Sequence, residues 1–329
     1  MKLLTYNPGD GPHCGVLDGD RVVDVAQLLM GNGLIRDVQA LLELRNAPLE
    51  RLREALARPG RPDGRPIGSV RVLAPILRPP AVRDFMAYEQ HVQSAARNRG
   101  GTVSEAWYRF PVFYFSSPLC IIGPDEEMPY PSASNRLDFE FELACVIGRE
   151  GTDVEAKDGM DYIAGFTILN DWSARDVQRD ESQLGLGPAK GKDFRTSLGP
   201  VVVTTDELAP FIKDQRLHVH MTGRINGEVW SDAQGGDMYH SFGDFVERAS
   251  RDARIVPGEV FGTGTCGTGC CNELVGNKVP GRRWLEPGDV VELEVEGIGV
   301  LRNRVGPKRH PNLNETYRYR PVEPAPAGS

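Results

Sequence analysis

The segment that most constrains the fold is an unbroken alternation of apolar and acidic side chains, Leu137-Asp138-Phe139-Glu140-Phe141-Glu142-Leu143. Successive side chains of a β-strand point to opposite faces, so this segment predicts a strand with one apolar and one acidic face. Like charges at strand spacing repel one another, and the commonest place for such a face is the solvent side of a half-exposed sheet. The alternative is a cation site, because oxygen-only ligands suit Mg²⁺, Ca²⁺ or Mn²⁺.

Composition limits the classes of protein that this chain can belong to. With 329 residues, 40% hydrophobic and 26% charged, it predicts about two folded domains rather than a disordered chain. A net charge of −8 argues against a nucleic-acid binder. No apolar run reaches the roughly 20 residues of a membrane helix, and the start breaks at Pro8, too early for a signal peptide. We therefore expect a cytoplasmic protein that binds neither nucleic acid nor membrane.

The first segment, residues 1–74, predicts a small α+β domain. Short β-favouring runs precede a helical stretch over about 37–57, with a possible break at Pro48. The Pro/Gly-rich residues 58–66 have the composition of a linker or long loop and mark the end of this unit.

The second segment, residues 75–318, is rich in predicted strands. The dipeptide Asn226-Gly227 is the strongest short signal for a hairpin, and residues 289–305 predict another. Helices are fewer, and we expect them at about 86–98, 173–181 and 242–250. The last residues, 319–329, have the composition of a disordered tail.

Six cysteines lie at positions 14, 120, 145, 266, 270 and 271. A zinc site in residues 265–271 lacks the paired C-x-x-C spacing and a second nearby cluster that structural zinc sites show. We therefore interpret these cysteines as small buried thiols in a Gly-rich turn. The aromatic run 107–115 is interpreted as core and pocket wall rather than as a stacking platform for bases.

A second polar stretch follows an apolar strand at residues 170–178. Asp171 can cap the next helix, or it can point from the strand end toward Glu140 and Glu142. Arg175 and Gln178 lie one helical turn apart and share a face. The later Gly-rich loop 186–194 carries Lys192, but it lacks the phosphate-binding pattern G-x-x-x-x-G-K-[ST].

Taken together, five elements resemble the fumarylacetoacetate hydrolase family over about residues 75–305: Asp84–His91, Leu137–Glu142, Asn170–Gln178, Gly191-Lys192 and Gly264–Gly267. The resemblance implies an α+β, mainly β fold. A small N-terminal domain is followed along the chain by a catalytic domain (75–318) built as a mixed β-sandwich roll. It also implies a homodimer and a divalent cation, Mg²⁺ first, with Ca²⁺ or Mn²⁺ as alternatives.

Carried over residue by residue, the resemblance implies three groups of site residues. The metal ligands are Asp84, Glu140, Glu142 and Asp171; the catalytic residues are His91, Glu273 and Lys192; the substrate contacts are Arg175, Gln178, Thr265 and Met86. Met86 stands where fumarylacetoacetases carry a tyrosine, so the substrate can differ from theirs. Ser94 stands where the shorter branch of the family often has a glutamate, which favours Glu273 as the partner of His91.

These roles predict an enzyme that acts on a small 2-oxo or β-diketo acid. The first hypothesis is a metal-dependent hydrolase that cleaves a C–C bond in an acylpyruvate or fumarylacetoacetate-like acid, with water activated by His91 and Glu273. A second is a hydratase, isomerase or decarboxylase of a 2-oxo or 2-hydroxydienoic acid on the same metal site. A third, of another class, is a non-catalytic binding protein on the same fold.

Overall fold

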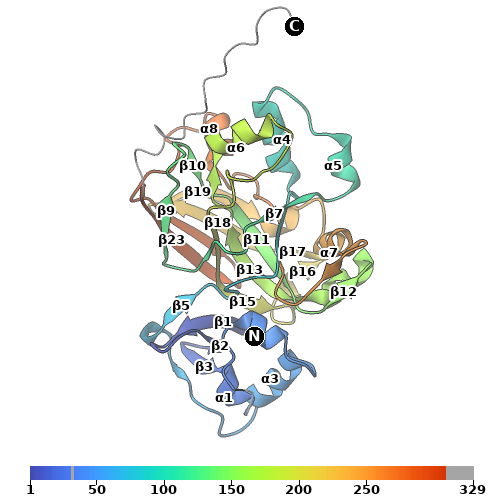
Figure 1. The fold of residues 1–329 in the computed structure, drawn as a ribbon, viewed down its shortest axis with the longest axis vertical. Helices are drawn as coiled ribbons and strands as arrows, with labels where there is room; N and C mark the ends of the chain where they lie inside the picture. Colours follow the sequence, from blue (N-terminus) through green and yellow to red (C-terminus); the bar gives the residue numbers. More distant parts are fainter. Residues whose placement is uncertain (31–32, 309–329) are drawn as a thin grey trace, which may run out of the picture.

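The computed structural model describes residues 1–30 and 33–308, which form a mainly β fold with helices around it (Figure 1). In these ranges a 12-stranded mixed sheet runs in the order β4-β3-β2-β1-β15-β13-β11-β21-β6-β7, with β5 beside β1 and β8 beside β15. Its strands are β1 (Lys2–Asn7), β2 (His13–Asp18), β3 (Arg21–Asp24), β4 (Arg65–Pro66), β5 (Arg71–Leu73), β6 (Val82–Phe85), β7 (Phe113–Ser116), β8 (Ile121–Ile122), β11 (Phe141–Ile147), β13 (Ile163–Asn170), β15 (Thr196–Thr204) and β21 (Val260–Gly262).

A second, five-stranded sheet has the order β19-β18-β22-β23-β9. Its strands are β9 (Glu127–Tyr130), β18 (His220–Ile225), β19 (Glu228–Gln234), β22 (Val290–Val295) and β23 (Gly299–Lys308). The hairpin predicted at Asn226-Gly227 is confirmed: both residues have positive φ, 53° and 80°, as a two-residue turn of type I′ requires. Short pairs complete the strands: β10 (Leu137–Asp138) with β14 (Ser173–Ala174), β12 (Gly151–Thr152) with β20 (Arg254–Ile255), and β16 (Ile212–Lys213) with β17 (Arg216–Leu217).

The helices are α1 (Val25–Leu28), α2 (Val38–Leu42), α3 (Pro48–Leu56), α4 (Glu89–Asn98), α5 (Glu105–Arg109), α6 (Arg175–Ser182), α7 (Phe242–Ser250) and α8 (Cys271–Gly276). The break predicted at Pro48 is real, because this proline begins α3. Helix α7 has the predicted bounds, fixed at its start by a capping box between Ser241 and Asp244. Neither α5 nor α8 was expected from the sequence. Among the described residues, no helix is long and apolar enough to cross a membrane.

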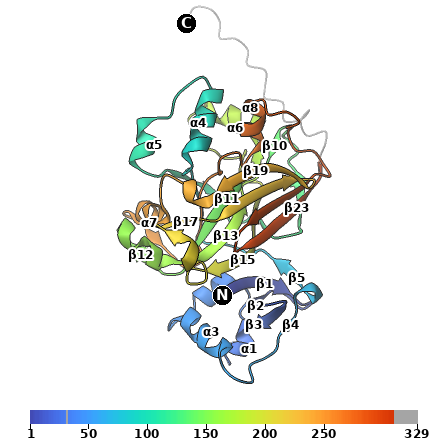
Figure 2. The ribbon, with the colours of Figure 1, turned by 180° about the vertical axis from the view of Figure 1, so that it is seen from behind.

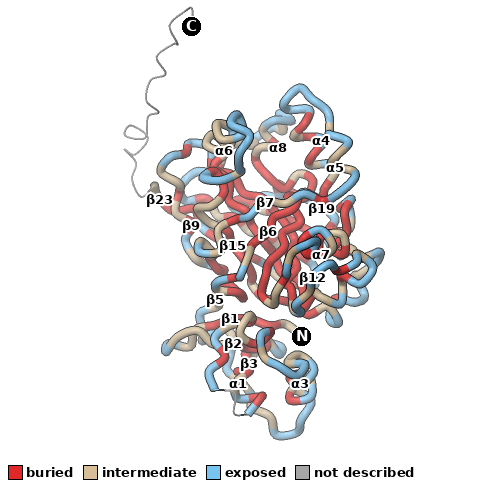
Figure 3. The backbone as a smooth tube through the Cα atoms, turned by 45° about the vertical axis from the view of Figure 1, so that its right-hand side comes forward, coloured by how far each residue is buried: buried red, intermediate tan, exposed pale blue. Residues whose placement is uncertain are grey.

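The central strand β11 is buried on both faces, and Figure 3 shows the strands as the buried part of the molecule. Its residues Phe141, Leu143 and Cys145 belong to the hydrophobic core shared with β18 and β22, so this face of β11 lies inside the sandwich. The alternate residues Ala144 and Val146 belong to a second core, which includes side chains of α1, α2 and α3. Glu142 therefore lies on the face of the large sheet turned away from the small sheet.

The N-terminal strands continue the large sheet rather than forming a sheet of their own. Strand β1 pairs antiparallel with β15, with Lys2 opposite Val203, and Figure 2 shows β1, β2 and β3 beyond β15. The domain boundary expected at residue 74 stays a prediction. The tail expected at 319–329 lies outside the described residues.

One prediction for the alternating segment is wrong. Residues 137–143 do not form one continuous strand, because β10 ends at Asp138 and β11 begins at Phe141, with only a single bridge between Glu140 and Cys270 in the interval. The acidic face is also not exposed: Asp138, Glu140 and Glu142 are all buried. Three buried carboxylates need hydrogen-bond donors or cations as partners inside the protein.

Candidate active site

Three acids from neighbouring strands of the large sheet meet at one point. Asp84 is on β6, Glu142 is on β11, and Asp171 directly follows β13, and their oxygen atoms lie within 4.8 Å of one another. Between β6 and β11 runs β21, which contributes Gly262 at this level. A Cβ on Gly262 would lie 2.7 Å from Glu142 Oε2 and 2.9 Å from Asp84 Oδ1, so only glycine leaves room for this acid trio.

The acid trio has the properties of a divalent-cation site. Asp84 Oδ1, Glu142 Oε1 and Asp171 Oδ1 are buried, and no hydrogen-bond donor among the described residues reaches them. Burial, followed by the repulsion of the neighbouring acids, raises the pKa of Glu142 well above its ordinary value. Burial also raises the pKa of Asp84 and Asp171, although the charge of Lys192 opposes it. An oxygen-only donor set fits Mg²⁺, Ca²⁺ or Mn²⁺, and the ion's charge would restore the ionised carboxylates.

Glu140, the fourth predicted metal ligand, accepts hydrogen bonds from two cationic side chains. Its Oε1 accepts a hydrogen bond from Arg175 Nη2 and its Oε2 accepts one from Lys192 Nζ, which also bonds Asp171 Oδ2. Burial alone would favour the neutral acid, but Arg175 and Lys192 lower the pKa of Glu140 well below its ordinary value. Gln178 accepts a hydrogen bond from Arg175 Nη1 at 2.9 Å, as the shared helix face of these two residues predicts.

Asp138, at the end of β10, contacts the same arginine as Glu140. Its Oδ2 accepts a hydrogen bond from Arg175 Nε at 2.7 Å. Its carboxylate also accepts the backbone N–H groups of Cys271 and Asn272, at 2.6 and 3.0 Å, at the first turn of α8. We call Asp138, Glu140, Arg175 and Lys192 the ion-pair network. The sequence grouped Asp138 with the acidic face, but its position at a helix N-terminus could not be predicted without α8.

The predicted pair of His91 and Glu273 is formed by two helices. His91 is on α4 and Glu273 is on α8, and His91 Nδ1 lies 3.1 Å from Glu273 Oε2. The glutamate side chain is 3% exposed and the histidine side chain 12% exposed. The pair adjoins the ion-pair network, since Cys270, the N-cap residue of α8, forms a β-bridge with Glu140. A carboxylate on one imidazole nitrogen orients the ring and stabilises its protonated form.

Tyr114 contacts the acid trio, and the sequence analysis missed this role. It is on β7, opposite Asp84 on β6, and its hydroxyl bonds Asp84 Oδ2 at 2.8 Å and also Asp171 Oδ2. Burial and the nearby carboxylates raise the pKa of this phenol well above its ordinary value, so the hydroxyl stays a hydrogen-bond donor. The aromatic run 107–115 gave no signal for this contact beyond the presence of a polar tip on a strand residue.

Met86 and Thr265, both predicted substrate contacts, lie in neighbouring segments beside the acid trio. Met86 follows β6 and is 39% exposed, whereas Thr265 follows β21 and is buried. The two segments touch at Gly264, whose φ is +78° and where a Cβ would lie 2.5 Å from the carbonyl oxygen of Phe85. The segment after β21 therefore depends on glycine for its path past β6.

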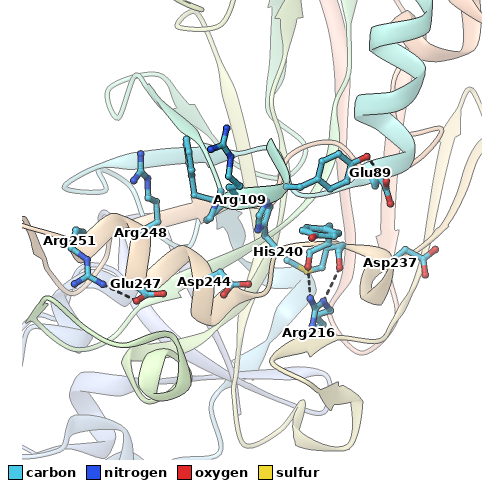
Figure 4. Close-up of a pocket in the computed structure, with 14 residues that line it drawn as sticks. Glu89, Arg109, Arg216, Asp237, His240, Asp244, Glu247, Arg248 and Arg251 are labelled. Atoms are coloured by element: carbon cyan, nitrogen blue, oxygen red, sulfur yellow. Dashed lines mark hydrogen bonds and ion pairs between the residues drawn. The ribbon is translucent and has the colours of Figure 1, made fainter. Parts of the chain in front are cut away.

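A surface cavity of about 800 Å³ lies apart from these residues (Figure 4). It is bordered by α5, α7 and the segment 237–240, and Arg109 and Arg248 stand along its rim. Of α4, only Glu89 lines it, held by Tyr108 at 2.7 Å. None of the predicted site residues lines this cavity, so size alone does not identify the candidate site.

Comparison with known proteins places the chain in a family. A family model described as fumarylacetoacetate hydrolase, C-terminal, matches residues 81–306, which include every predicted site residue. A human mitochondrial oxaloacetate tautomerase is 32% identical over 311 residues, covering 93% of this chain and 91% of the relative.

Two solved structures show the same fold over nearly the whole chain. A 5-carboxymethyl-2-hydroxymuconate delta-isomerase of Mycobacterium smegmatis aligns with a TM-score of 0.65 and 29% identity, covering 94% of this chain and 100% of the other. A fumarylacetoacetate hydrolase of Exiguobacterium antarcticum aligns with a TM-score of 0.68 and 25% identity over the same shares. The chain therefore belongs to the fumarylacetoacetate hydrolase family, a family of enzymes.

Proposed function

We propose that this protein is a divalent-cation-dependent enzyme that interconverts the keto and enol forms of a small 2-oxo dicarboxylic acid. The observation that carries the proposal is the His91–Glu273 pair, which adjoins buried acids whose free oxygens suit a cation. Tautomerisation needs one base and one centre that stabilises negative charge on oxygen, and no activated water. The names of the human relative and of the Mycobacterium smegmatis structure, a tautomerase and an isomerase, support this choice over hydrolysis.

Each residue of the site has a defined task in this reaction. A cation held by Asp84, Glu142 and Asp171 would act as a Lewis acid on the 2-oxo group and fix the orientation of the substrate. His91 takes the proton from the carbon beside the ketone, and Glu273 stabilises the imidazolium that results. Lys192 supplies positive charge near the oxygen that becomes negative. Return of the same proton to that oxygen gives the enol with no change in atoms.

Arg175 has a positioning task in this proposal. Its guanidinium donors hold Asp138, Glu140 and Gln178, so it fixes the walls of the site around Lys192. A bidentate or fork-like arginine is well suited to such a task because its geometry is planar and rigid.

A second candidate function is hydrolysis of a C–C bond in an acylpyruvate or fumarylacetoacetate-like acid. Ser94, one helical turn after His91, bonds Asn277 at 3.2 Å and supplies no further carboxylate, so Glu273 is the acid that orients the histidine. The same pair could then take a proton from water, which would attack the carbonyl carbon. The structure of the Exiguobacterium antarcticum hydrolase is the comparison that favours this candidate.

An assay of purified protein with Mg²⁺ and oxaloacetate distinguishes these two candidate functions. We expect accelerated conversion of enol to keto oxaloacetate. The loss of enol absorbance measures this conversion, and the mass of the substrate should stay unchanged. His91→Ala should lower kcat/KM by about 10²-fold or more. His220→Ala is the matched control, because this histidine also pairs with an acid, Asp232 at 2.8 Å, but lies exposed on β18.

Two results would contradict the proposal. Cleavage of acylpyruvates into two acids, without tautomerase activity, would favour the hydrolase. Wild type and His91→Ala that are equally inactive on every 2-oxo acid tested would instead favour a binding protein on this fold.

A further inference from the structure

A second group of possible metal ligands lies beside the acid trio, and the proposed reaction does not use it as a metal site. One ligand atom each from His91, Cys270 and Glu273 lie within 4.8 Å of one another. Cys270 is the N-cap residue of α8, and its thiol is fully buried. No local sequence pattern indicates this group, because its cysteine has no C-x-x-C partner and the histidine comes from α4, far away in the chain.

The donor atoms of this group differ in kind from those of the acid trio. The acid trio offers only oxygen, which suits hard cations such as Mg²⁺. The group at α8 offers sulfur, nitrogen and oxygen, which is the donor set of zinc sites. Three protein ligands with a fourth position open to solvent is also a common arrangement for zinc.

The geometry around His91 allows an ion to replace a proton. His91 Nδ1 and Glu273 Oε2 are 3.1 Å apart and share a hydrogen. Zinc bonds to nitrogen and oxygen are about 2.0–2.2 Å long, so an ion bound to both atoms needs little change in their separation. Among the described residues, the one hydrogen bond to the Cys270 thiol is a long contact, 3.4 Å, from the backbone N–H of Glu273. It can turn toward the ion at the cost of this weak cap.

We propose that His91, Cys270 and Glu273 form an inhibitory site for Zn²⁺ or another thiophilic divalent ion. Binding requires the Cys270 thiol to release its proton to solvent and the His91 imidazole to change tautomer, its Nδ1 proton being exchanged through solvent for one on Nε2, so the thiolate, a neutral imidazole and the carboxylate become the ligands. A histidine that ligates an ion through this nitrogen loses its carboxylate partner and no longer acts as a base. The site therefore goes beyond the proposed function, since it would switch off any reaction that uses His91.

Metal binding can be measured without any substrate. Full-length protein is first saturated with Mg²⁺, which occupies oxygen sites, and Co²⁺ is then added as a spectroscopic substitute for zinc. We expect one equivalent of Co²⁺ to give thiolate-to-metal charge-transfer absorption, and Zn²⁺ to displace it. No charge-transfer absorption, or no displacement by Zn²⁺, would overturn the proposal.

The variant Cys270→Ser identifies the thiol. Serine keeps an N-cap oxygen for α8 but removes the sulfur ligand, so folding of the helix is preserved. We expect Zn²⁺ affinity to fall at least about tenfold and the charge-transfer absorption to vanish. Cys266→Ser is the control, because Cys266 is buried in the same segment but is not part of the group.

Activity then gives an independent readout. With Mg²⁺ in excess, Zn²⁺ should inhibit wild type and Cys266→Ser at equal concentrations, and should inhibit Cys270→Ser only at concentrations at least about tenfold higher. Equal Zn²⁺ binding by wild type and Cys270→Ser would contradict the site even if no substrate is found. Failure of the tautomerase assay alone would leave the spectroscopic result standing, so the two proposals fail separately.

Discussion

The acid trio and the ion-pair network lie side by side, and both contain buried carboxylates, but the partners of these carboxylates differ. In the ion-pair network, Arg175 and Lys192 bond both oxygens of Glu140 and lower its pKa. In the acid trio, Glu142 has an oxygen without a donor and a raised pKa. A buried acid therefore has its charge balanced by protein cations in one place, whereas in the other it keeps an oxygen that a cation could bind.

The largest expected effect comes from replacing Glu140, the acid of the ion-pair network that both Arg175 and Lys192 contact. Glu140→Gln leaves Arg175 and Lys192 buried with less opposing charge, and should lower the free energy of unfolding by about 3–5 kcal/mol. Urea denaturation in the presence of a chelator measures this loss. Glu155→Gln is the control, because its pair with Lys157 is exposed and should contribute far less to stability. A stability loss for Glu140→Gln as small as the control's would break the distinction between the two groups.

Glu142→Gln should have the opposite profile. The amide resembles the neutral acid that the raised pKa favours when no ion is bound, so stability in chelator should be kept. Divalent-ion binding and kcat/KM should each fall by about 10²-fold or more, because a direct ligand is lost. Calorimetric titration with Mg²⁺ and the tautomerase assay measure these changes. Unchanged Mg²⁺ affinity in Glu142→Gln would show that Glu142 is not a ligand of the cation.

The two groups should also respond to pH with opposite signs. Glu142 has a raised pKa in the folded state, so its contribution to stability is present below its unfolded value of 4.5 and is lost as pH rises through the raised value. Glu140 has a lowered pKa, so its contribution is present above 4.5 and is lost as pH falls through the lowered value.

Thermal denaturation with and without Mg²⁺ measures the first of these effects. As pH rises above 4.5, Tm in chelator should fall relative to Tm in Mg²⁺, because the ion binds the ionised acids. In Glu142→Gln, the difference between Tm in Mg²⁺ and Tm in chelator should increase less with pH than in wild type. A gap that narrows as pH rises in wild type would contradict the assignment.

The smallest expected effect concerns Tyr114, which touches the acid trio from β7. Tyr114→Phe keeps the ring but removes the hydroxyl that bonds Asp84 and Asp171. We expect Mg²⁺ affinity to fall about tenfold, as for other partners of metal ligands, with stability changed by only about 1 kcal/mol. Phe113→Tyr on the same strand is a control for adding or removing a phenol near β6. Unchanged Mg²⁺ affinity in Tyr114→Phe would show that this hydroxyl only fills space.

Local chemistry explains which parts could be predicted from the sequence. The turn at Asn226-Gly227 and the helix after Ser241 are coded by residues that contact one another within a few positions. The metal and catalytic residues were predicted by resemblance, and the structure brings Asp84, Glu142 and Asp171 together and pairs His91 with Glu273.

The remaining features depend on contacts between distant segments. Helix α8 is only six residues long, and Asp138, which accepts a backbone N–H of its first turn, lies more than 130 positions earlier. No local pattern therefore predicts this helix. The break between β10 and β11 cannot be seen in an alternation that fits one strand perfectly. The role of Tyr114 needs the register of β6 and β7, and the engagement of Glu140 needs the position of Lys192.

The most direct test of the central claim is a crystal structure of the protein grown with Mn²⁺, read through the ion's anomalous scattering. The account predicts one strong peak within about 2.0–2.4 Å of oxygens from Asp84, Glu142 and Asp171, with Glu140 still bonded to Arg175 and Lys192. A peak that lies elsewhere, or its absence at saturating Mn²⁺, would contradict the assignment of these three acids as a cation site.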